Sequence, residues 1–294
     1  MIELQGISKQ FDSIKAVDSL NVTINEGRIC GFLGPNGAGK TTAIRMLMNI
    51  IHPDSGKILF NKSENRPPSN EIGYLPEERG LYQKISVQET LAYFAHLRNV
   101  KNIEGKISDF LDQFDLGDRL QSKVNELSKG NQQKLQFINT ILHDPKYLVL
   151  DEPFSGLDPI NQILLKEILE EKKIAGKTII FSSHQMDQVE KICDDVVMIN
   201  QGQLILSGPL QEIKKSHGDA LLQVIPEQSK DLSHPYFAAK NAQIRSGAAY
   251  FQLDSINKQK VINELNENFD LKSIRVAEPG LEDIFIQLVQ ESSK

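Results

Sequence analysis

The sequence predicts an α/β fold followed by a small α+β domain, and three observations carry this prediction. Residues 29–33 form a short apolar run that leads through a glycine-rich turn into a helix-like stretch. Apolar runs of strand length then alternate with stretches of helical periodicity as far as residue 215, which is typical of a parallel sheet covered by helices. From residue 219 onward the order of strands and helices changes.

The first part of the chain indicates an antiparallel sheet that leads into the strand before the glycine-rich turn. Its apolar and polar side chains alternate, and Glu26-Gly27 forms a turn between two of its strands. Strands are expected at 2–8, 20–25, 28–33, 58–60 and 71–75.

The middle of the chain alternates helices with buried strands. Ser86 is a suitable cap for the first helix, whose apolar residues recur at helical spacing. Helices are expected at 86–97, 103–114, 131–142, 163–174 and 187–193. Buried strands are expected at 147–150 and 178–181, and Gln201-Gly202 indicates a hairpin between 196–200 and 204–206.

A boundary is expected at 214–218, which divides the chain into domains at 1–215 and 219–294. The second domain is large enough to fold around its own core. Strands are expected there at 221–225, 242–245, 249–253 and 273–276, and helices at 261–269 and 281–289. Ser246-Gly247 is expected to turn the chain between two of these strands. With 8 Lys and Arg against 11 Asp and Glu, this domain offers no basic face for nucleic acid.

Composition narrows the class of protein further. The net charge of -6 argues against a broad nucleic-acid surface. No apolar run reaches the ~20 residues of a membrane span, and the N-terminus lacks the pattern of a signal peptide. Cys30 and Cys193 are expected to be buried thiols rather than a disulfide or a metal pair. These features together favour a cytosolic protein.

The glycine-rich turn carries the first chemical motif. Gly34 to Thr41 fits G-x-x-x-x-G-K-[ST] at every fixed position. Its glycines let successive N–H groups point into one hollow at a helix N-terminus, which favours a phosphate. Lys40 is expected to reach the β- and γ-phosphates of a nucleoside triphosphate, and Thr41 to ligate Mg²⁺. The expected contacts from this loop are Gly34, Pro35, Asn36, Gly37, Ala38, Gly39, Lys40, Thr41 and Thr42.

Two further stretches place polar residues where nucleotide chemistry needs them. Asp151 and Glu152 follow the apolar run 147–150, so one carboxylate is suited to hold Mg²⁺ and the next to activate a water. Ser128 and Gly130 open the helix expected at 131–142 and form a second site ready for an anion.

Read together, these motifs resemble those of an ATP-binding cassette (ABC) ATPase, the nucleotide-binding subunit of ABC transporters. The resemblance covers about residues 1–215, and the motifs occur in the family's order. It implies an α/β P-loop NTPase core with an antiparallel β subdomain and a helical signature subdomain, plus the small C-terminal α+β domain. It also implies a head-to-tail dimer, in which the signature of one subunit closes over the ATP in the P-loop of the other.

The resemblance assigns roles to individual residues. Asp151 becomes the carboxylate on the Mg²⁺ side and Glu152 the general base. His184, in Ser182-Ser183-His184, becomes the switch residue that senses the γ-phosphate. Other implied contacts are Phe11 on the adenine, the signature residues Ser128, Lys129 and Gly130 on the partner's nucleotide, and Asp158 in the loop at the dimer interface.

Two positions depart from the family's pattern. Lys129 stands where the family usually has glycine, and it adds a positive charge near a phosphate site. Glu77 stands where the family usually has a glutamine that touches Mg²⁺ and begins the loop that couples ATP to the membrane half. We expect Glu77 to be a metal ligand, since its carboxylate is a hard oxygen donor, with slower or differently coupled turnover.

The combination of residues 77–82, 129–131 and 277–285 resembles a bacterial branch of ABC ATPases associated with sodium extrusion and drug export. The leading hypothesis is therefore an ATPase, with ATP and Mg²⁺ as cofactors, on the inner face of the cell membrane. A second ATPase subunit and a separate multi-span permease are its expected partners.

The main alternative is a soluble ABC-type ATPase that acts on DNA or the ribosome. The short interval between Lys40 and Ser128, the single cassette and the acidic balance disfavour it. A sensor that binds nucleotide without turnover is a third possibility, and the presence of Glu152 and His184 weighs against it.

Overall fold

The computed structural model describes residues 1–78, 80–217, 221–240, 242–245, 247–252, 258–277 and 279–292. The chain divides into two compact units, Met1–Leu210 and Gln211–Lys294. The observed division, after Leu210, comes a few residues before the boundary that we expected at 214–218. Part of the expected linker is helical, because α7 (Leu210–Ser216) runs through it. This helix was not anticipated from the sequence. Residue 218 lies outside the described residues.

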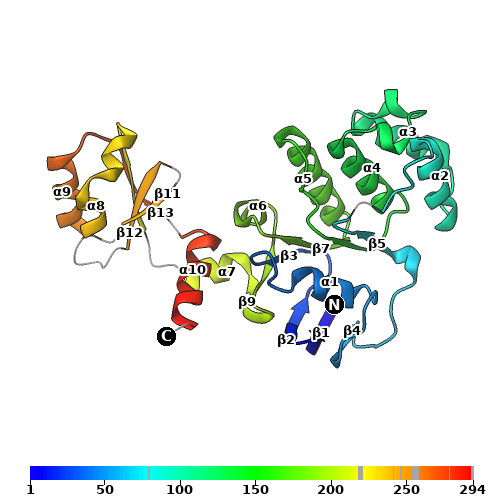
Figure 1. Ribbon diagram of the computed structural model, residues 1–294, viewed down its shortest axis with the longest axis horizontal. Coiled ribbons are helices and arrows are strands. Elements are labelled where there is room, and N and C mark those ends of the chain that lie inside the picture. Colours follow the sequence, from blue (N-terminus) through cyan, green and yellow to red (C-terminus); the bar gives the residue numbers. More distant parts are fainter. Residues whose placement is uncertain are drawn as a thin grey trace. The chain divides into compact units, whose positions relative to one another are not determined.

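A six-stranded sheet forms the centre of the larger unit (Figure 1). Its strands are β5 (Ile72–Leu75), β6 (Tyr147–Leu150), β7 (Thr178–Ser183), β3 (Ile29–Leu33), β8 (Asp195–Asn200) and β9 (Gln203–Pro209), in that spatial order. The strands from β5 to β8 pair in parallel, and β9 closes the sheet as the antiparallel partner of β8. Every residue of β3, β6 and β7 is buried, as their apolar sequences predicted.

A three-stranded antiparallel sheet, in the order β2 (Ile14–Ile24), β1 (Ile2–Phe11) and β4 (Ser55–Phe60), completes the β framework. It was expected, although its strands are longer than predicted. One hydrophobic core joins this sheet, the parallel sheet and helix α1 (Lys40–Leu47). Ile7 of β1, Ile44 of α1 and Val149 of β6 all belong to it. The helix after the glycine-rich turn is therefore fixed by packing on both sheets.

The remaining helices of this unit are α2 (Val87–Leu97), α3 (Ile103–Gln113), α4 (Lys129–Ile141), α5 (Pro159–Ile174) and α6 (Met186–Glu190), with short 3₁₀ turns at Ser69–Glu71, Gly117–Arg119 and Val124–Glu126. Ser86 caps α2 as predicted, because its side chain accepts the Glu89 N–H while the Glu89 carboxylate accepts the Ser86 N–H. Helix α6 is shorter than the predicted helix 187–193 and ends before Cys193. Both cysteines are free and buried, as expected.

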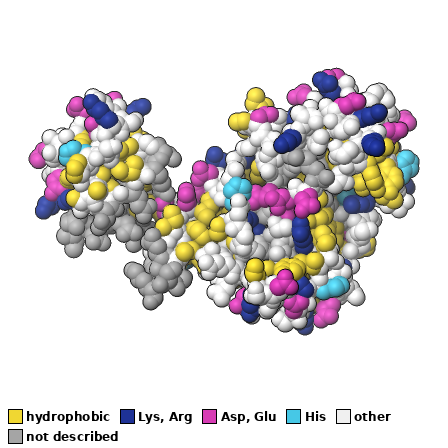
Figure 2. Space-filling model, viewed as in Figure 1, with side chains coloured by type: hydrophobic (Ala, Val, Ile, Leu, Met, Phe, Trp, Pro, Cys, Tyr) yellow, Lys and Arg dark blue, Asp and Glu magenta, His cyan; other side chains and the backbone are white. Residues whose placement is uncertain are grey.

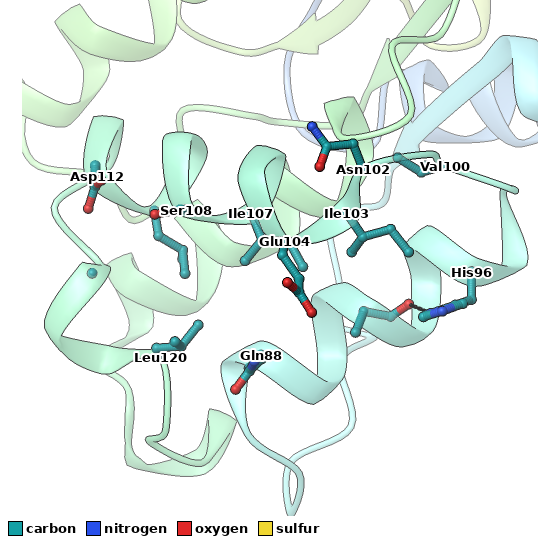
Figure 3. A pocket seen from close by; sticks show the side chains of 13 residues that line it. Gln88, His96, Val100, Asn102, Ile103, Glu104, Ile107, Ser108, Asp112 and Leu120 are labelled. Atoms are coloured by element: carbon teal, nitrogen blue, oxygen red, sulfur yellow. Dashed lines mark hydrogen bonds between the residues drawn. The ribbon is translucent and has the colours of Figure 1, made fainter.

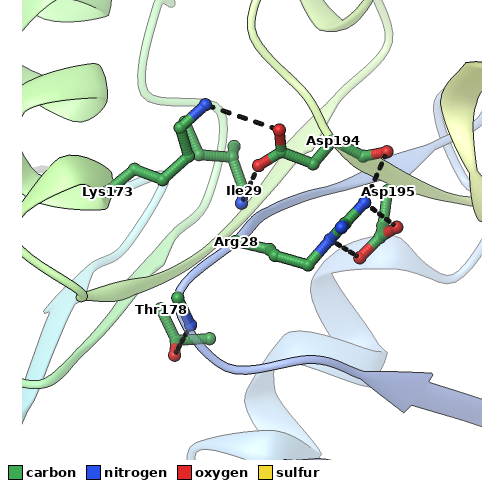
Figure 4. A network of polar contacts seen from close by, with 7 residues as sticks. Arg28, Ile29, Lys173, Thr178, Asp194 and Asp195 are labelled. Carbon is green, nitrogen blue, oxygen red and sulfur yellow. Dashed lines mark hydrogen bonds and ion pairs between the residues drawn. The ribbon is translucent and has the colours of Figure 1, made fainter.

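A polar network joins the N-terminal ends of the neighbouring strands β7, β3 and β8, on the side of the sheet opposite to the glycine-rich turn (Figure 4). Arg28 forms a bidentate pair with Asp195, at 2.7 Å from Nε to Oδ2 and 2.8 Å from Nη2 to Oδ1. Asp194 accepts the Ile29 N–H at 2.9 Å, and the Thr178 hydroxyl accepts the Gly27 N–H at 3.0 Å. These contacts fix the start of β3 against β7 and β8.

The smaller unit is an α+β fold, as predicted. After α7, its elements are β10 (Leu221–Pro226), α8 (Pro235–Ala239), β11 (Gln243–Arg245), β12 (Ala248–Gln252), α9 (Lys258–Asn268), β13 (Leu271–Ala277) and α10 (Leu281–Ser292), with a 3₁₀ turn at Ser229–Ser233. The antiparallel sheet has the order β11-β12-β10-β13, which is the split β-α-β arrangement. Phe237 of α8 and Leu265 of α9 pack on the sheet in one core. Ser246 of the expected turn lies outside the described residues.

Candidate functional site

The glycine-rich loop between β3 and α1 has the shape that its sequence predicted. Gly34, Gly37 and Gly39 have φ angles of 152°, 80° and 104°. A Cβ on Gly39 would lie 2.3 Å from the carbonyl oxygen of Ala16, and one on Gly34 would lie 2.1 Å from that of Ile199. The loop therefore requires glycine at both positions for steric as well as conformational reasons.

A pocket of about 240 Å³ lies over this loop. It is lined by Ala16, Asn36, Gly37, Ala38, Gly39, Lys40, Thr41, Thr42, Glu77 and Glu152. The structure thus brings Glu77 and Glu152, which are far apart in the sequence, to the predicted phosphate loop. Phe11, Ser128, Lys129, Gly130, Asp158 and His184 do not line this pocket.

Lys40 is almost buried and folds back onto its own loop. Its Nζ donates to the carbonyl oxygens of Gly34 at 2.7 Å and Pro35 at 3.0 Å. Burial lowers the pKa of Lys40, and the nearby carboxylates of Glu152, Asp151 and Glu77 oppose that shift. A phosphate in the pocket would likewise favour the charged form of Lys40.

Asp151, directly after β6, is fully buried. Its Oδ1 accepts hydrogen bonds from the hydroxyls of Ser182 at 2.5 Å and Thr41 at 3.1 Å. Its Oδ2 has no hydrogen-bond partner among the described residues. A buried carboxylate oxygen without a donor, next to a threonine hydroxyl at the phosphate loop, fits a hard divalent cation such as Mg²⁺.

Glu152 follows in a left-handed conformation, with φ of 49°. Its N–H donates to the Ser182 hydroxyl at 2.9 Å, and its Oε1 lies 3.0 Å from Nδ1 of His184. The Glu152 side chain is 13% exposed and lines the pocket, and its carboxylate is in contact with His184. The predicted base and the predicted switch residue are therefore in direct contact.

The predicted signature lies apart from this pocket, at the start of α4. The Ser128 hydroxyl accepts the Asn131 N–H at 3.2 Å and so caps the helix. A Cβ on Gly130 would lie 3.3 Å from the Gly156 carbonyl oxygen, which places the signature beside the loop that carries Asp158. Asp158 caps α5 by accepting the Asn161 N–H at 3.0 Å.

Phe11 lies at the end of β1, is 46% exposed, and has the Lys9 ammonium 5.7 Å from its ring centroid. This exposed ring is suited to stack on a base. Ala16, from the neighbouring strand β2, lines the phosphate pocket.

Sequence reasoning missed two contributors to the site. Ala16 has no chemical signature in the sequence. Ser182 was visible in Ser182-Ser183-His184, but only the histidine of that motif was given a role; the structure shows that Ser182 contacts both Asp151 and Glu152.

A phosphate loop between a strand and a helix, with two carboxylates directly after a parallel strand, defines a P-loop NTPase. The family model described as "ABC transporter" matches residues 17–155, and the model for the "ATP-binding protein DrrA1-3-like, C-terminal domain" matches residues 208–289. The chain is 39% identical to the ABC transporter ATP-binding protein YhaQ of Bacillus subtilis, over 98% of each chain.

Other relatives agree. The chain is 34% identical to the ABC transporter ATP-binding protein NatA of Bacillus subtilis, over 81% of this chain and 97% of NatA. A solved ATP-binding subunit of an ABC transporter superposes with a TM-score of 0.68 at 28% identity, over 74% of this chain and 92% of that one. The chain therefore belongs to the ABC transporter ATP-binding proteins, in the branch with a DrrA-like C-terminal domain.

As a member of this family, the chain is an ATPase subunit that couples ATP hydrolysis to transport. Its function implies a membrane permease as partner. Within the described residues, none of the helices is both long and apolar enough to cross a membrane.

Proposed function

We propose that two ATPase subunits close head to tail over two ATP molecules. The observation that carries this proposal is the separation of two phosphate-ready features in one chain. Ser128 and Gly130 open α4 outside the pocket that Lys40 and Thr41 line. A second subunit supplies the missing half of each site, and Asp158, beside the signature, lies at the interface.

In the proposed site, Asp151, Thr41 and Glu77 would hold Mg²⁺, and a bound Mg²⁺ would supply positive charge against the phosphates. Glu152 accepts a proton from water as the water oxygen bonds to the γ-phosphorus and the bond to the β–γ bridging oxygen breaks. Lys40 stabilises the negative charge of the phosphates, and His184 contacts the γ-phosphate while it orients Glu152. ADP and phosphate leave when the dimer opens.

We infer that the permease binds between α2 and α3, where a pocket of about 650 Å³ is present (Figure 3). Gln88 of α2 lies across from Glu104 and Ile107 of α3. The described residues that line this pocket include two carboxylates but no lysine or arginine, which suits a short permease helix with a basic side chain. Apolar side chains also gather over α2 in Figure 2.

A permease bound at this pocket would hold the subunit on the inner face of the membrane, which is the location we propose. Tyr82, Tyr93 and Phe94 form an aromatic cluster with ring centroids 5.2–6.4 Å apart, and the last two follow the pocket residue Ala92 on α2. Tyr82 follows Glu77 by five positions, so the same segment runs from the phosphate pocket to the proposed permease surface.

We further infer export of sodium ions or drug-like compounds. This inference is supported by relatives named for bacitracin transport, in Bacillus licheniformis, and for Nod factor export, in a Rhizobium species. They are 31% identical to this chain, over 98% of its length in each case. No observation favours the alternative of a soluble ATPase acting on DNA or the ribosome.

The substitution Glu152→Gln tests the proposed mechanism. ATP binding should persist, hydrolysis should fall about 100-fold or more, and ATP should trap the dimer, because the amide cannot accept the proton. Measurements are phosphate release, nucleotide affinity and molar mass by light scattering with and without ATP. Glu167→Gln, which removes the same charge from exposed surface on α5, is the control. Turnover retained in Glu152→Gln would refute the assignment.

A further inference from the structure

Helix α4 and strand β5 form a closely packed unit. A Cβ on Gly73 of β5 would lie 2.5 Å from the carbonyl oxygen of Thr140 on α4, so the two backbones approach as closely as glycine permits. The Thr140 hydroxyl also donates to the Tyr74 carbonyl oxygen at 3.3 Å. The helix is therefore a fixed support for the segment that follows β5, beginning at Pro76.

Gln136, in the third turn of α4, reaches this segment. Its side chain is 4% exposed, and its Nε2 donates to the carbonyl oxygens of Pro76 and Glu78, each at 3.2 Å. These two carbonyls flank Glu77 on either side. One buried amide group thus uses both of its N–H bonds to fix the backbone around a single residue.

Glu77 is the residue that this fixed backbone presents to the phosphate pocket, together with Lys40 and Glu152. Glu78 is directed elsewhere, with its carboxylate 3.8 Å from the Arg45 guanidinium. If the Gln136 amide were lost, two carbonyls would lose their donor and the segment could turn. The Gln136 amide thus holds the backbone on both sides of Glu77.

The Oε1 atom of Gln136 is buried and has no hydrogen-bond partner among the described residues. A buried polar atom without a partner is costly. An apolar side chain of similar size at this position would avoid that cost. The presence of an amide here is thus explained by its two donated bonds.

We propose that Gln136 is a positioning residue that holds Glu77 in the phosphate pocket. The inference rests on the proposed role of Glu77 as a metal ligand. It adds that the affinity of the nucleotide site for its divalent cation is set by a residue on the signature helix. Gln136 itself does not line the phosphate pocket.

The test measures metal binding rather than activity. Mn²⁺ binding to the full chain, saturated with a non-hydrolysable ATP analogue, is followed by electron paramagnetic resonance. Gln136→Leu should raise the Mn²⁺ dissociation constant about tenfold, the effect expected when one well-placed hydrogen-bonded contact is lost. Affinity for the analogue without metal should stay within about twofold, since the phosphate loop is untouched.

Two further variants separate positioning from a general loss of packing. Thr140→Val removes a buried hydroxyl that bonds to the carbonyl oxygens of Tyr74 in β5 and of Gln136, and it leaves the Gln136 amide bonds to Pro76 and Glu78 in place. Its Mn²⁺ affinity should match that of the original chain. Gln136→Met keeps the length and flexibility of the side chain without its donors. It should reproduce the effect of Gln136→Leu, and it serves if the leucine variant fails to fold.

A double variant decides whether Gln136 acts through Glu77. Glu77→Gln alone should weaken Mn²⁺ binding, and adding Gln136→Leu should weaken it no further. If Glu77→Gln weakens Mn²⁺ binding and neither Gln136 variant does, the inference fails while the role of Glu77 stands. Additive effects would also overturn it. If Glu77→Gln has no effect, the proposed metal role fails, and the inference fails with it.

Discussion

Removing the Ser182 hydroxyl tests how the two carboxylates after β6 are held. Ser182 is fully buried near the end of β7. Its Oγ donates to Asp151 at 2.5 Å and accepts the Glu152 N–H at 2.9 Å. Because one hydroxyl bonds to both residues, Ser182→Ala should disturb the proposed metal ligand and the proposed base together.

The size of the effect follows from the two bonds. A hydrogen bond to a charged carboxylate, such as that of Asp151, contributes about 1.5–3 kcal/mol to stability. The bond from the neutral Glu152 N–H contributes about 1 kcal/mol. Ser182→Ala should therefore lower the free energy of unfolding by about 2–4 kcal/mol. ATP hydrolysis should fall about tenfold or more, because Glu152 loses the bond that accompanies its left-handed backbone.

Ser183→Ala is the matched control. Ser183 is 3% exposed on the same strand, and its Oγ accepts the Gln185 N–H at 3.0 Å without contact to either carboxylate. It should cost only about 1 kcal/mol and leave hydrolysis unchanged. The assays are urea unfolding followed by circular dichroism, and phosphate release at saturating ATP. Equal losses of stability and activity in the two variants would refute the reasoning.

Two other predictions concern the proposed permease surface and the pH dependence of stability. Glu104→Lys should reduce co-purification of a multi-span protein from solubilised membranes, while Asp109→Lys, on the same helix but outside the pocket, should not; equal retention in both would contradict the proposed docking site. Burial lowers the pKa of His143 to about 4, so its contribution to stability is complete above pH 6.5 and disappears as the pH falls through 4. Between pH 7 and pH 4, His143→Gln should reduce the decrease in the free energy of unfolding by up to about 3 kcal/mol, measured by urea unfolding at both pH values. An unchanged decrease would contradict the lowered pKa.

The sequence was sufficient to predict the parts of the site whose chemistry is local. The phosphate loop needs glycines and a lysine at fixed spacing, and Gly39 has the conformation and the close backbone contact that this spacing implied. Asp151 was recognisable because it follows a continuous apolar strand. The alternation of strands and helices likewise predicted the parallel sheet and its antiparallel neighbour.

The parts that could not be predicted depend on contacts between distant segments. Ser182 follows Asp151 by 31 positions, and nothing in either local sequence specifies that they bond. Helices α7 and α8 were missed because they are short, and short helices depend on packing more than on propensity. The three glutamines of α4 carry no motif in the sequence, and only the structure shows that each of them donates to backbone carbonyls of other segments.

Two of those glutamines connect the signature helix to the backbone beside two residues of the proposed site, Glu152 and Glu77. Gln133 is 4% exposed and donates to the carbonyl oxygen of Pro153, directly after Glu152, at 3.3 Å. Gln136, one turn later, donates on both sides of Glu77. Since α4 begins at Ser128, a shift of this helix would act on the backbone next to Glu152 and next to Glu77 at the same time. The side chains proposed for metal binding and for proton transfer therefore depend on the same helix for their position, although no local motif joins them.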